Sequence, residues 1–133
     1  MSSLRGLIWD GKILTPMLSE ILRERYGCKI DQASSGEEVL ERFRSSTKPY
    51  NFVILKYVPE REKMDGIKTM EQMRAVEKET RLTPATLCLH TFAEPNEVMR
   101  EELRKVNAVY ISKTKTSESF NQLDEIMKKL QAA

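Results

Sequence analysis

Most of the side chains that could do chemistry in this chain stand where short apolar runs end. Asp10, Lys56, His90, Thr91 and Lys113 each lie at, or shortly after, the end of such a run. They supply a carboxylate, two ammonium groups, a hydroxyl and the only histidine in the sequence. Any triad of the Ser-His-Asp or Cys-His type would therefore have to use His90.

His90 could be a structural residue or a residue with a chemical role. It lies two positions after Cys88, so in a strand both side chains would share one face. A metal site would need further ligands, and no other Cys or His lies nearby. We therefore expect a structural or rim position for His90 rather than a ligand or a base.

The glycines give a single phosphate-loop pattern. Gly6 and Gly11-Lys12 have the spacing of GxxxxGK[ST], but Ile13 stands where the magnesium-binding hydroxyl would be. The intervening residues are typical of a strand and not of a phosphate cradle. The match is therefore interpreted as accidental.

The length, composition and net charge of the chain limit the classes of protein to which it can belong. The chain has 133 residues, 40% hydrophobic and 32% charged, as in an ordinary globular domain and unlike a disordered or collagen-like chain. We expect one domain over residues 1–133. With 22 basic and 20 acidic residues the net charge is +2, too close to balance for a dedicated nucleic-acid binder.

Cysteines and apolar runs bear on location. Cys28 and Cys88 form no CxxC motif, and one pair is not a disulfide framework, so a reducing, cytoplasmic setting is expected. No apolar run approaches about 18 residues, so no membrane span is expected. The first residues lack the apolar region of a signal peptide.

Short apolar runs alternate with amphipathic runs along the chain. The alternation implies a parallel sheet with helices on both faces, and such sheets bind ligands at the carboxyl ends of their strands. The pattern predicts strands at 6–9, 28–31, 52–55, 85–89 and 108–111, and helices beginning near 15, 35, 66, 95 and 116.

Several helix ends carry recognisable signals. Thr15 suits the cap of the first helix and Pro16 its first position, and Gly27 is typical of its end. Ser35 and Glu38 have the spacing of a capping box at the start of the second helix.

The residues at the ends of the apolar runs resemble those of the receiver domain of two-component response regulators, and the resemblance covers nearly the whole chain. In that family the first strand ends in an acidic pair, and counting back from Gly27 puts Asp10 and Gly11 at those positions. The third strand of the family ends in the Asp that accepts phosphate, and Lys56 stands there. The fourth ends in Thr or Ser, which Thr91 matches.

Later positions extend the resemblance. Tyr110 and Lys113 match the family's switch aromatic and its lysine, although Thr114 replaces the usual proline. Pro59 and Met64-Asp65-Gly66 match a further motif, with a longer segment between them than usual. The resemblance implies a flavodoxin-like (βα)5 fold, with a five-stranded parallel sheet in the order 2-1-3-4-5 and helices on both faces.

The substitutions change the chemistry that the resemblance implies. A receiver holds Mg²⁺ with clustered carboxylates, uses one as the nucleophile, and stabilises the phosphoryl group with a cation and a hydroxyl. Here Asp10 (−1), Lys56 (+1) and Lys113 (+1) change the pocket charge from about −2 to about +1. An ammonium about 4 Å from a divalent ion costs about 8 kcal/mol at an effective dielectric of about 20.

The resemblance therefore implies a degenerate pseudo-receiver that has no Mg²⁺ cofactor and no phosphoacceptor. We hypothesise that Lys56 pairs with Asp10 as a tethered cation. Such a domain would be no enzyme but a phosphorylation-independent protein–protein interaction module. Its expected partner is a signalling protein (a histidine kinase, phosphotransfer or output domain), bound through the fourth helix, fifth strand and fifth helix. Whether the chain forms a homodimer is left open.

Two alternatives remain open at this point. One is a phosphoacceptor receiver of non-standard geometry, to which the loop 60–65, with its three acids, could supply a carboxylate. The other is a small flavodoxin-like ligand-binding protein.

Overall fold

A five-stranded parallel sheet forms the centre of the molecule, in the order β2-β1-β3-β4-β5. The computed structural model describes residues 3–57, 65–80, 83–114 and 116–133. The flavodoxin-like order expected from the sequence is confirmed. The elements are β1 Arg5–Trp9, α1 Gly11–Tyr26, β2 Lys29–Gln32, α2 Gly36–Ser45, β3 Phe52–Lys56, α3 Gly66–Thr80, β4 Thr86–Thr91, α4 Glu97–Lys105, β5 Ala108–Ser112 and α5 Thr116–Ala132.

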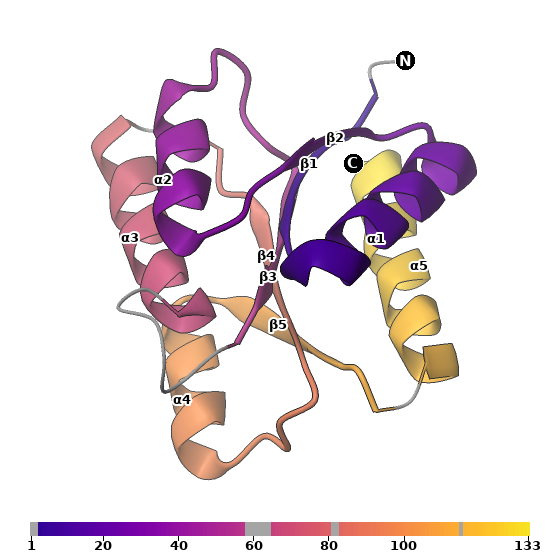
Figure 1. Ribbon diagram of the computed structural model, residues 1–133. Coiled ribbons are helices and arrows are strands. Elements are labelled where there is room, and N and C mark those ends of the chain that lie inside the picture. The colour runs from indigo at the N-terminus through magenta and orange to yellow at the C-terminus, as the bar shows by residue number, and fades with distance from the viewer. Residues whose placement is uncertain (1–2, 58–64, 81–82, 115) are drawn as a thin grey trace.

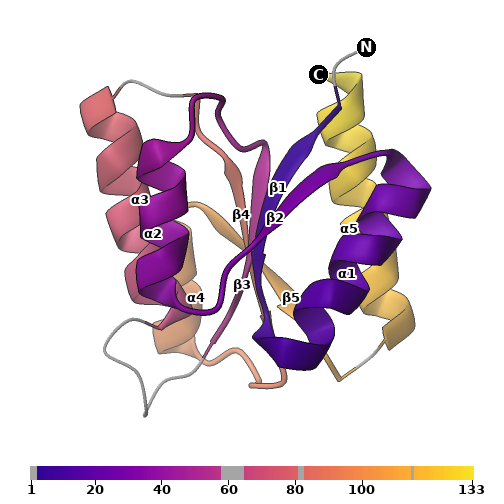
Figure 2. The ribbon, with the colours of Figure 1, turned by 45° about the horizontal axis from the view of Figure 1, so that its top comes forward.

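The helices form one layer on each side of the sheet. α1 and α5 cover one face, and α2, α3 and α4 cover the other (Figures 1 and 2). Successive strand residues face opposite layers. Trp9 and Leu55 accordingly belong to the core under α2, α3 and α4, whereas Ile8 and Ile54 belong to the core under α1 and α5. This alternation decides which strand-end side chains can meet.

Helix α1 begins at Gly11, well before the Thr15-Pro16 pair, so the predicted start is wrong. The hydroxyl Oγ1 of Thr15 accepts a hydrogen bond from the backbone N–H of Asp10 at 2.8 Å, which stabilises the first turn. Pro16 lies inside the helix and lacks the N–H of a regular helical residue. The predicted end is confirmed: Gly27 is left-handed, with φ of 65°.

Two further helix starts differ in detail from the predictions. Ser35 caps α2 as expected, with its Oγ accepting from Glu38 N at 3.1 Å, but the Glu38 carboxylate bonds the Ser34 hydroxyl at 2.9 Å. Helix α4 begins after Asn96, whose Oδ1 accepts from Met99 N at 2.8 Å. The predicted start lay near residue 95, but Asn96 and not Pro95 caps the helix, because only the Asn side chain supplies an acceptor oxygen.

The remaining elements agree with the predicted positions to within a few residues. Residues 58–64, with Pro59 and Met64 of the family motif and most of the 60–65 loop, lie outside the described residues. No helix within the described ranges has the length and apolar character needed to cross a membrane.

Candidate functional site

Three strands bring ionisable side chains to one point at the carboxyl edge of the sheet. Asp10 follows β1, His90 lies near the end of β4, and Lys113 follows β5. Each stands two positions after a buried residue of the core under α1 and α5. Because side chains alternate along a strand, all three face the same layer.

The carboxylate of Asp10 lies between two basic side chains. Its Oδ1 lies 2.6 Å from Nζ of Lys113, and its Oδ2 lies 2.7 Å from Nδ1 of His90. The Asp10 side chain is 0% exposed and that of Lys113 11%. Because an ionised carboxylate only accepts, Nδ1 of His90 donates in this contact. Charge-assisted contacts of this kind are strong where water is excluded.

A structural or rim position was expected for His90, and the structure places it 7% exposed against the carboxylate of Asp10. The sequence interpretation did not predict this contact. The signal was present in the strand alternation: His90 follows buried Cys88 by two positions, as Asp10 follows buried Ile8.

Lys56 ends β3 and pairs in register with His90. Its Nζ lies 5.4 Å from the centroid of the Trp9 ring, within the range of a cation–π interaction. The hypothesis from the sequence paired Asp10 with Lys56. The structure gives the Asp10 carboxylate Lys113 and His90 as close partners, neither of which that hypothesis had assigned to it.

Gly11 follows Asp10 and opens helix α1 with φ of +86°. L side chains rarely adopt this backbone conformation, although a Cβ built there would meet no atom within 4 Å. The position at which the family resemblance expects a second acid is therefore shaped for glycine. A carboxylate at position 11 would need a different local backbone.

Thr91 and Tyr110 both bond the loop that follows β4. The buried hydroxyl of Thr91 accepts from Ala93 N at 3.1 Å, and the hydroxyl of Tyr110 donates to Ala93 O at 2.7 Å. The backbone N–H of Lys113 donates to Thr91 O at 2.8 Å. Thr91, at the end of β4, and Tyr110, in β5, thus both contact Ala93 of the loop that follows β4.

The acids of the 60–65 loop divide between described and undescribed residues. The Oδ1 of Asp65 accepts from Lys68 N at 2.8 Å, which caps the start of α3. Glu60 and Glu62 lie outside the described residues. Within the described ranges, no group of three or more His, Cys, Asp and Glu side chains is placed to hold a metal ion.

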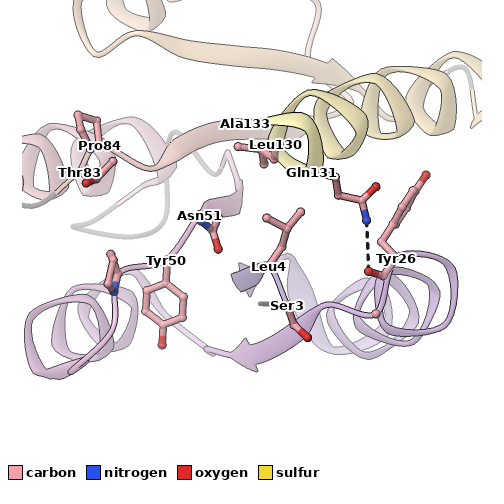
Figure 3. Close-up of a pocket in the computed structure, with 12 residues that line it drawn as sticks. Ser3, Leu4, Tyr26, Tyr50, Asn51, Thr83, Pro84, Leu130, Gln131 and Ala133 are labelled. Atoms are coloured by element: carbon pink, nitrogen blue, oxygen red, sulfur yellow. Dashed lines mark hydrogen bonds between the residues drawn. The ribbon is translucent and has the colours of Figure 1, made fainter. Parts of the chain in front are cut away.

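A cavity of about 790 Å³ lies at the opposite, amino edge of the sheet. Leu4, Asn51 and Pro84, which precede strands β1, β3 and β4, are among its lining residues (Figure 3). Gln131 of α5 also lines this cavity, and its Nε2 donates a hydrogen bond to Tyr26 O at 3.4 Å (Figure 3). The described lining carries neither Asp, Glu, Lys nor Arg, so this cavity does not share the chemistry of the Asp10 pocket.

A second cavity, of about 440 Å³, lies at the carboxyl edge beside the Asp10 pocket. Its wall includes Trp9 of β1, Lys56 of β3, and Gly11 and Lys12 of α1. The loop between β2 and α2 closes the other side, with Ala33, Ser34 and, from α2, Glu38.

Comparisons with known proteins identify the fold. No family model matches the sequence, and no curated protein matches it. Solved structures do: the receiver domain of histidine kinase CKI1 from Arabidopsis thaliana, complexed with Mg²⁺ and BeF3⁻, has a TM-score of 0.76 at 17% identity, covering 98% of this chain and 91% of that one.

Two bacterial proteins are similar to the same degree. Chemotaxis protein CheY4 of Vibrio cholerae has a TM-score of 0.73 at 18% identity, over 94% of this chain and 99% of its own. The receiver domain of Francisella response regulator 1452 has a TM-score of 0.70 at 19% identity, over 96% and 98%. The chain therefore has the fold of receiver domains, and what its site does depends on its own residues.

Proposed function

We propose that this chain is a pseudo-receiver of two-component signalling, a protein–protein interaction module that works without phosphorylation and is not itself an enzyme. The observation that carries the proposal is the Asp10 carboxylate, buried between Lys113 and His90. A carboxylate paired on both oxygens is a structural anion, because a metal or phosphoryl group would first have to displace a basic partner.

The described residues at this edge do not suit Mg²⁺. Mg²⁺ requires several oxygen ligands in near-octahedral geometry. Asp10 offers one carboxylate, already contacted on both oxygens, and Gly11 offers no side chain. Lys56 brings a positive charge to the end of β3. The donor set therefore opposes a divalent cation in charge and in number.

The same residues do not suit phosphoryl acceptance at the end of β3. An ammonium group forms no acyl phosphate, so Lys56 cannot replace a carboxylate nucleophile. Lys113 and Thr91, which would stabilise a phosphoryl group, are committed to Asp10 and to Ala93. These contacts support one lasting conformation of the domain.

The surface of α4 and β5 supports the proposed partner face. Phe92 and Val98 are each 66% exposed and Val109 is 37% exposed. They lie before α4, in α4 and in β5 respectively. Exposed apolar side chains on these elements are available to a protein partner. We propose that a signalling protein binds here, in the cytoplasm, where the two buried free thiols would stay reduced.

The phosphorylation part of the proposal is tested by intact-mass spectrometry after incubation with acetyl phosphate and Mg²⁺. We expect no phosphate adduct, whereas an authentic aspartate-bearing receiver treated in parallel should gain one. An acyl phosphate on any residue of this chain would contradict the proposal.

The partner face is tested by capture from a lysate of the source cells. Val98→Glu on α4 should lose a signalling protein that the unaltered chain retains. Ile13→Glu on α1, where the side chain is 75% exposed, is the matched control and should retain it. Loss with Ile13→Glu alone would move the interface to α1.

A further inference from the structure

The outer side of helix α1 carries a row of apolar side chains. Ile13 is 75% exposed and Met17 is 47% exposed, and Ile21 follows one turn later, half-buried. Residues four positions apart lie on one side of a helix, so these three form a continuous stripe. α1 and α5 lie side by side on one face of the sheet, and no described element covers the outer side of α1 (Figures 1 and 2). Single exposed apolar residues are ordinary on a protein surface, whereas contiguous ones mark contact sites.

A groove lies beside the end of this stripe, between α1 and α5. Its volume is about 500 Å³, and Ile21 of α1 and Phe120 of α5 supply its apolar lining. The polar lining residues are Glu24, Arg25, Ser117 and Asn121. The same side of the molecule therefore has protruding apolar side chains at one end, Ile13 and Met17, and a recess at the other. A surface with both features can pack against a copy of itself.

The spacing of the stripe is symmetric about Met17. Ile13 precedes Met17 by four residues, and Ile21 follows it by four. In an antiparallel pair of α1 helices centred on Met17, Ile13 of each copy would therefore face Ile21 of the other, and the two Met17 side chains would meet at the two-fold axis. Such an interface is isologous, because both copies use the same surface. The recess beside Ile21 is open to the exposed Ile13 of the second copy.

The exposed charges along α1 complement those of an antiparallel copy. Lys12 lies in the first turn, which has no acidic residue, whereas the exposed acids Glu20 and Glu24 lie in the second half of the helix. In the antiparallel pair these acids lie opposite the first turn of the other copy, where Lys12 and the positive end of the helix attract them. Arg23 is directed toward β2 instead, because its Nη2 donates to Ile30 O at 2.8 Å. A parallel pair would place like charges beside one another.

From this complementarity we propose that α1 is a homodimer interface, on which a second copy of this chain binds in antiparallel orientation about Met17. The inference goes beyond the signalling partner proposed for α4 and β5. α1 and α4 lie in opposite layers of the molecule (Figure 2), so one domain can bind its copy and its partner together. The 16 residues of α1 span about 24 Å. A contact along one helix of this length is at the small end of protein interfaces, so we expect a weak dimer.

Sedimentation equilibrium measures the association. Between about 1 µM and about 1 mM protein, the mass should rise from 15.4 kDa toward twice that value and no further, because a two-fold interface closes. Met17→Lys places two ammonium groups opposite one another at the axis and should weaken the dimer at least about tenfold. Val98→Lys, at an exposed apolar position of α4, is the matched comparison and should leave the dimer unchanged. Circular dichroism checks that both variants fold.

Charge reversal tests the orientation of the two copies. Lys12→Glu and Glu24→Lys should each weaken the dimer about three- to tenfold, because each places like charges across the interface. The double variant restores opposite charges and should recover most of the lost affinity.

Several results would each overturn the inference: a protein that stays monomeric over this range, assembly beyond the dimer, single variants that associate as tightly as the unaltered chain, or a double variant no tighter than the single ones. Loss of the dimer with Val98→Lys and not with Met17→Lys would place the contact on α4 and overturn it too. The outcome is separate from that of the proposed function, since Ile13→Glu should weaken the dimer and still retain the signalling protein.

Discussion

Oδ2 of Asp10 lies 2.7 Å from Nδ1 of His90, across a separation of 80 residues along the chain. With Lys113 at 2.6 Å on the other oxygen, this contact draws the carboxylate toward β4 and β5. The same aspartate stands at the cap position of α1 and does not cap it. The side chain of Asp10 thus joins the ends of β1, β4 and β5 instead of capping the helix that follows it.

Removing the ammonium partner should be costly. Lys113→Met leaves a buried carboxylate with one partner, and breaking such a pair costs about 3 to 5 kcal/mol. Lys105→Met, at an exposed position of α4, should cost less than about 0.5 kcal/mol. Urea unfolding followed by circular dichroism measures both. Equal stabilities of the two variants would show that the Asp10–Lys113 pair contributes little.

Replacing His90 should lower the free energy of unfolding less than replacing Lys113 does. The loss should be smaller when the new side chain can still donate a hydrogen bond. His90→Leu loses the hydrogen bond to Asp10 and should lower the free energy of unfolding by about 1 to 3 kcal/mol. His90→Gln keeps a side-chain N–H and should recover part of that loss. If the Leu variant is as stable as the unaltered chain, the contact is not a stabilising one.

Much of the fold was predictable because local signals agree with the packing. The Phe52–Leu55 run is buried on both faces of β3, as a central parallel strand requires. Gly27 ends α1 in a left-handed conformation, as its type suggests. The start of α1 was not predictable from Thr15 and Pro16, because the hydroxyl of Thr15 bonds backward to Asp10 and stabilises a turn that opens earlier.

The sequence placed Asp10 and Lys113 in the site, but it did not predict that His90 joins them or that Lys113 and His90 both contact the carboxylate of Asp10. Sequence spacing placed Asp10 and Lys113 at strand ends, and both meet in the structure. Which cation faces the carboxylate depends on side-chain alternation along β4 and β5 and on their register, which sequence spacing alone does not give. The contact of His90 with Asp10 was not predicted, because a lone histidine in an apolar run belongs to no motif. The backbone conformation of Gly11 likewise has no sequence signal beyond the glycine itself.

Glu77 should be a strong determinant of stability. Its buried carboxylate accepts from Arg74 Nη1 at 2.7 Å and from the backbone N–H of Ala85 at 2.7 Å, joining the end of α3 to the start of β4. Glu77→Ala leaves the N–H of Ala85 unpaired and removes the carboxylate partner of Arg74, whose Nη1 keeps its bond to Ala85 O. The substitution should therefore cost about 3 kcal/mol. Glu79→Ala, exposed on the same helix, is the matched control and should stay within about 0.5 kcal/mol. Comparable midpoints in urea would count against this role.

A carboxylate at the end of β3 should begin to restore affinity for divalent cations. Lys56→Asp removes a positive charge and adds an oxygen donor near Asp10, so Mg²⁺ should raise the melting temperature of this variant and not that of the parent chain. Adding Gly11→Asp should lower stability without Mg²⁺ by about 1 to 3 kcal/mol, since position 11 has φ of +86°. A folded Lys56→Asp variant that is indifferent to Mg²⁺ would refute the assignment of position 56.

Tyr50 should make stability fall at alkaline pH. Burial, reinforced by the 2.5 Å hydrogen bond to Asp31, raises the pKa of Tyr50 to about 12, whereas an unfolded tyrosine titrates near about 10. The folded state therefore favours the neutral phenol. Its contribution to the free energy of unfolding is fully present below about pH 10 and is lost as the pH rises toward about 12.

Tyr50→Phe has no ionisable group at this position and isolates the effect. At pH 7 the variant should be less stable by about 1 kcal/mol, because the hydrogen bond to Asp31 is lost. The difference between the two proteins should shrink between about pH 10 and 12, as the phenol of the unaltered chain ionises on unfolding. Urea unfolding at fixed ionic strength across this range measures it, and a difference that stays constant with pH would show that the phenol of Tyr50 titrates equally in both states.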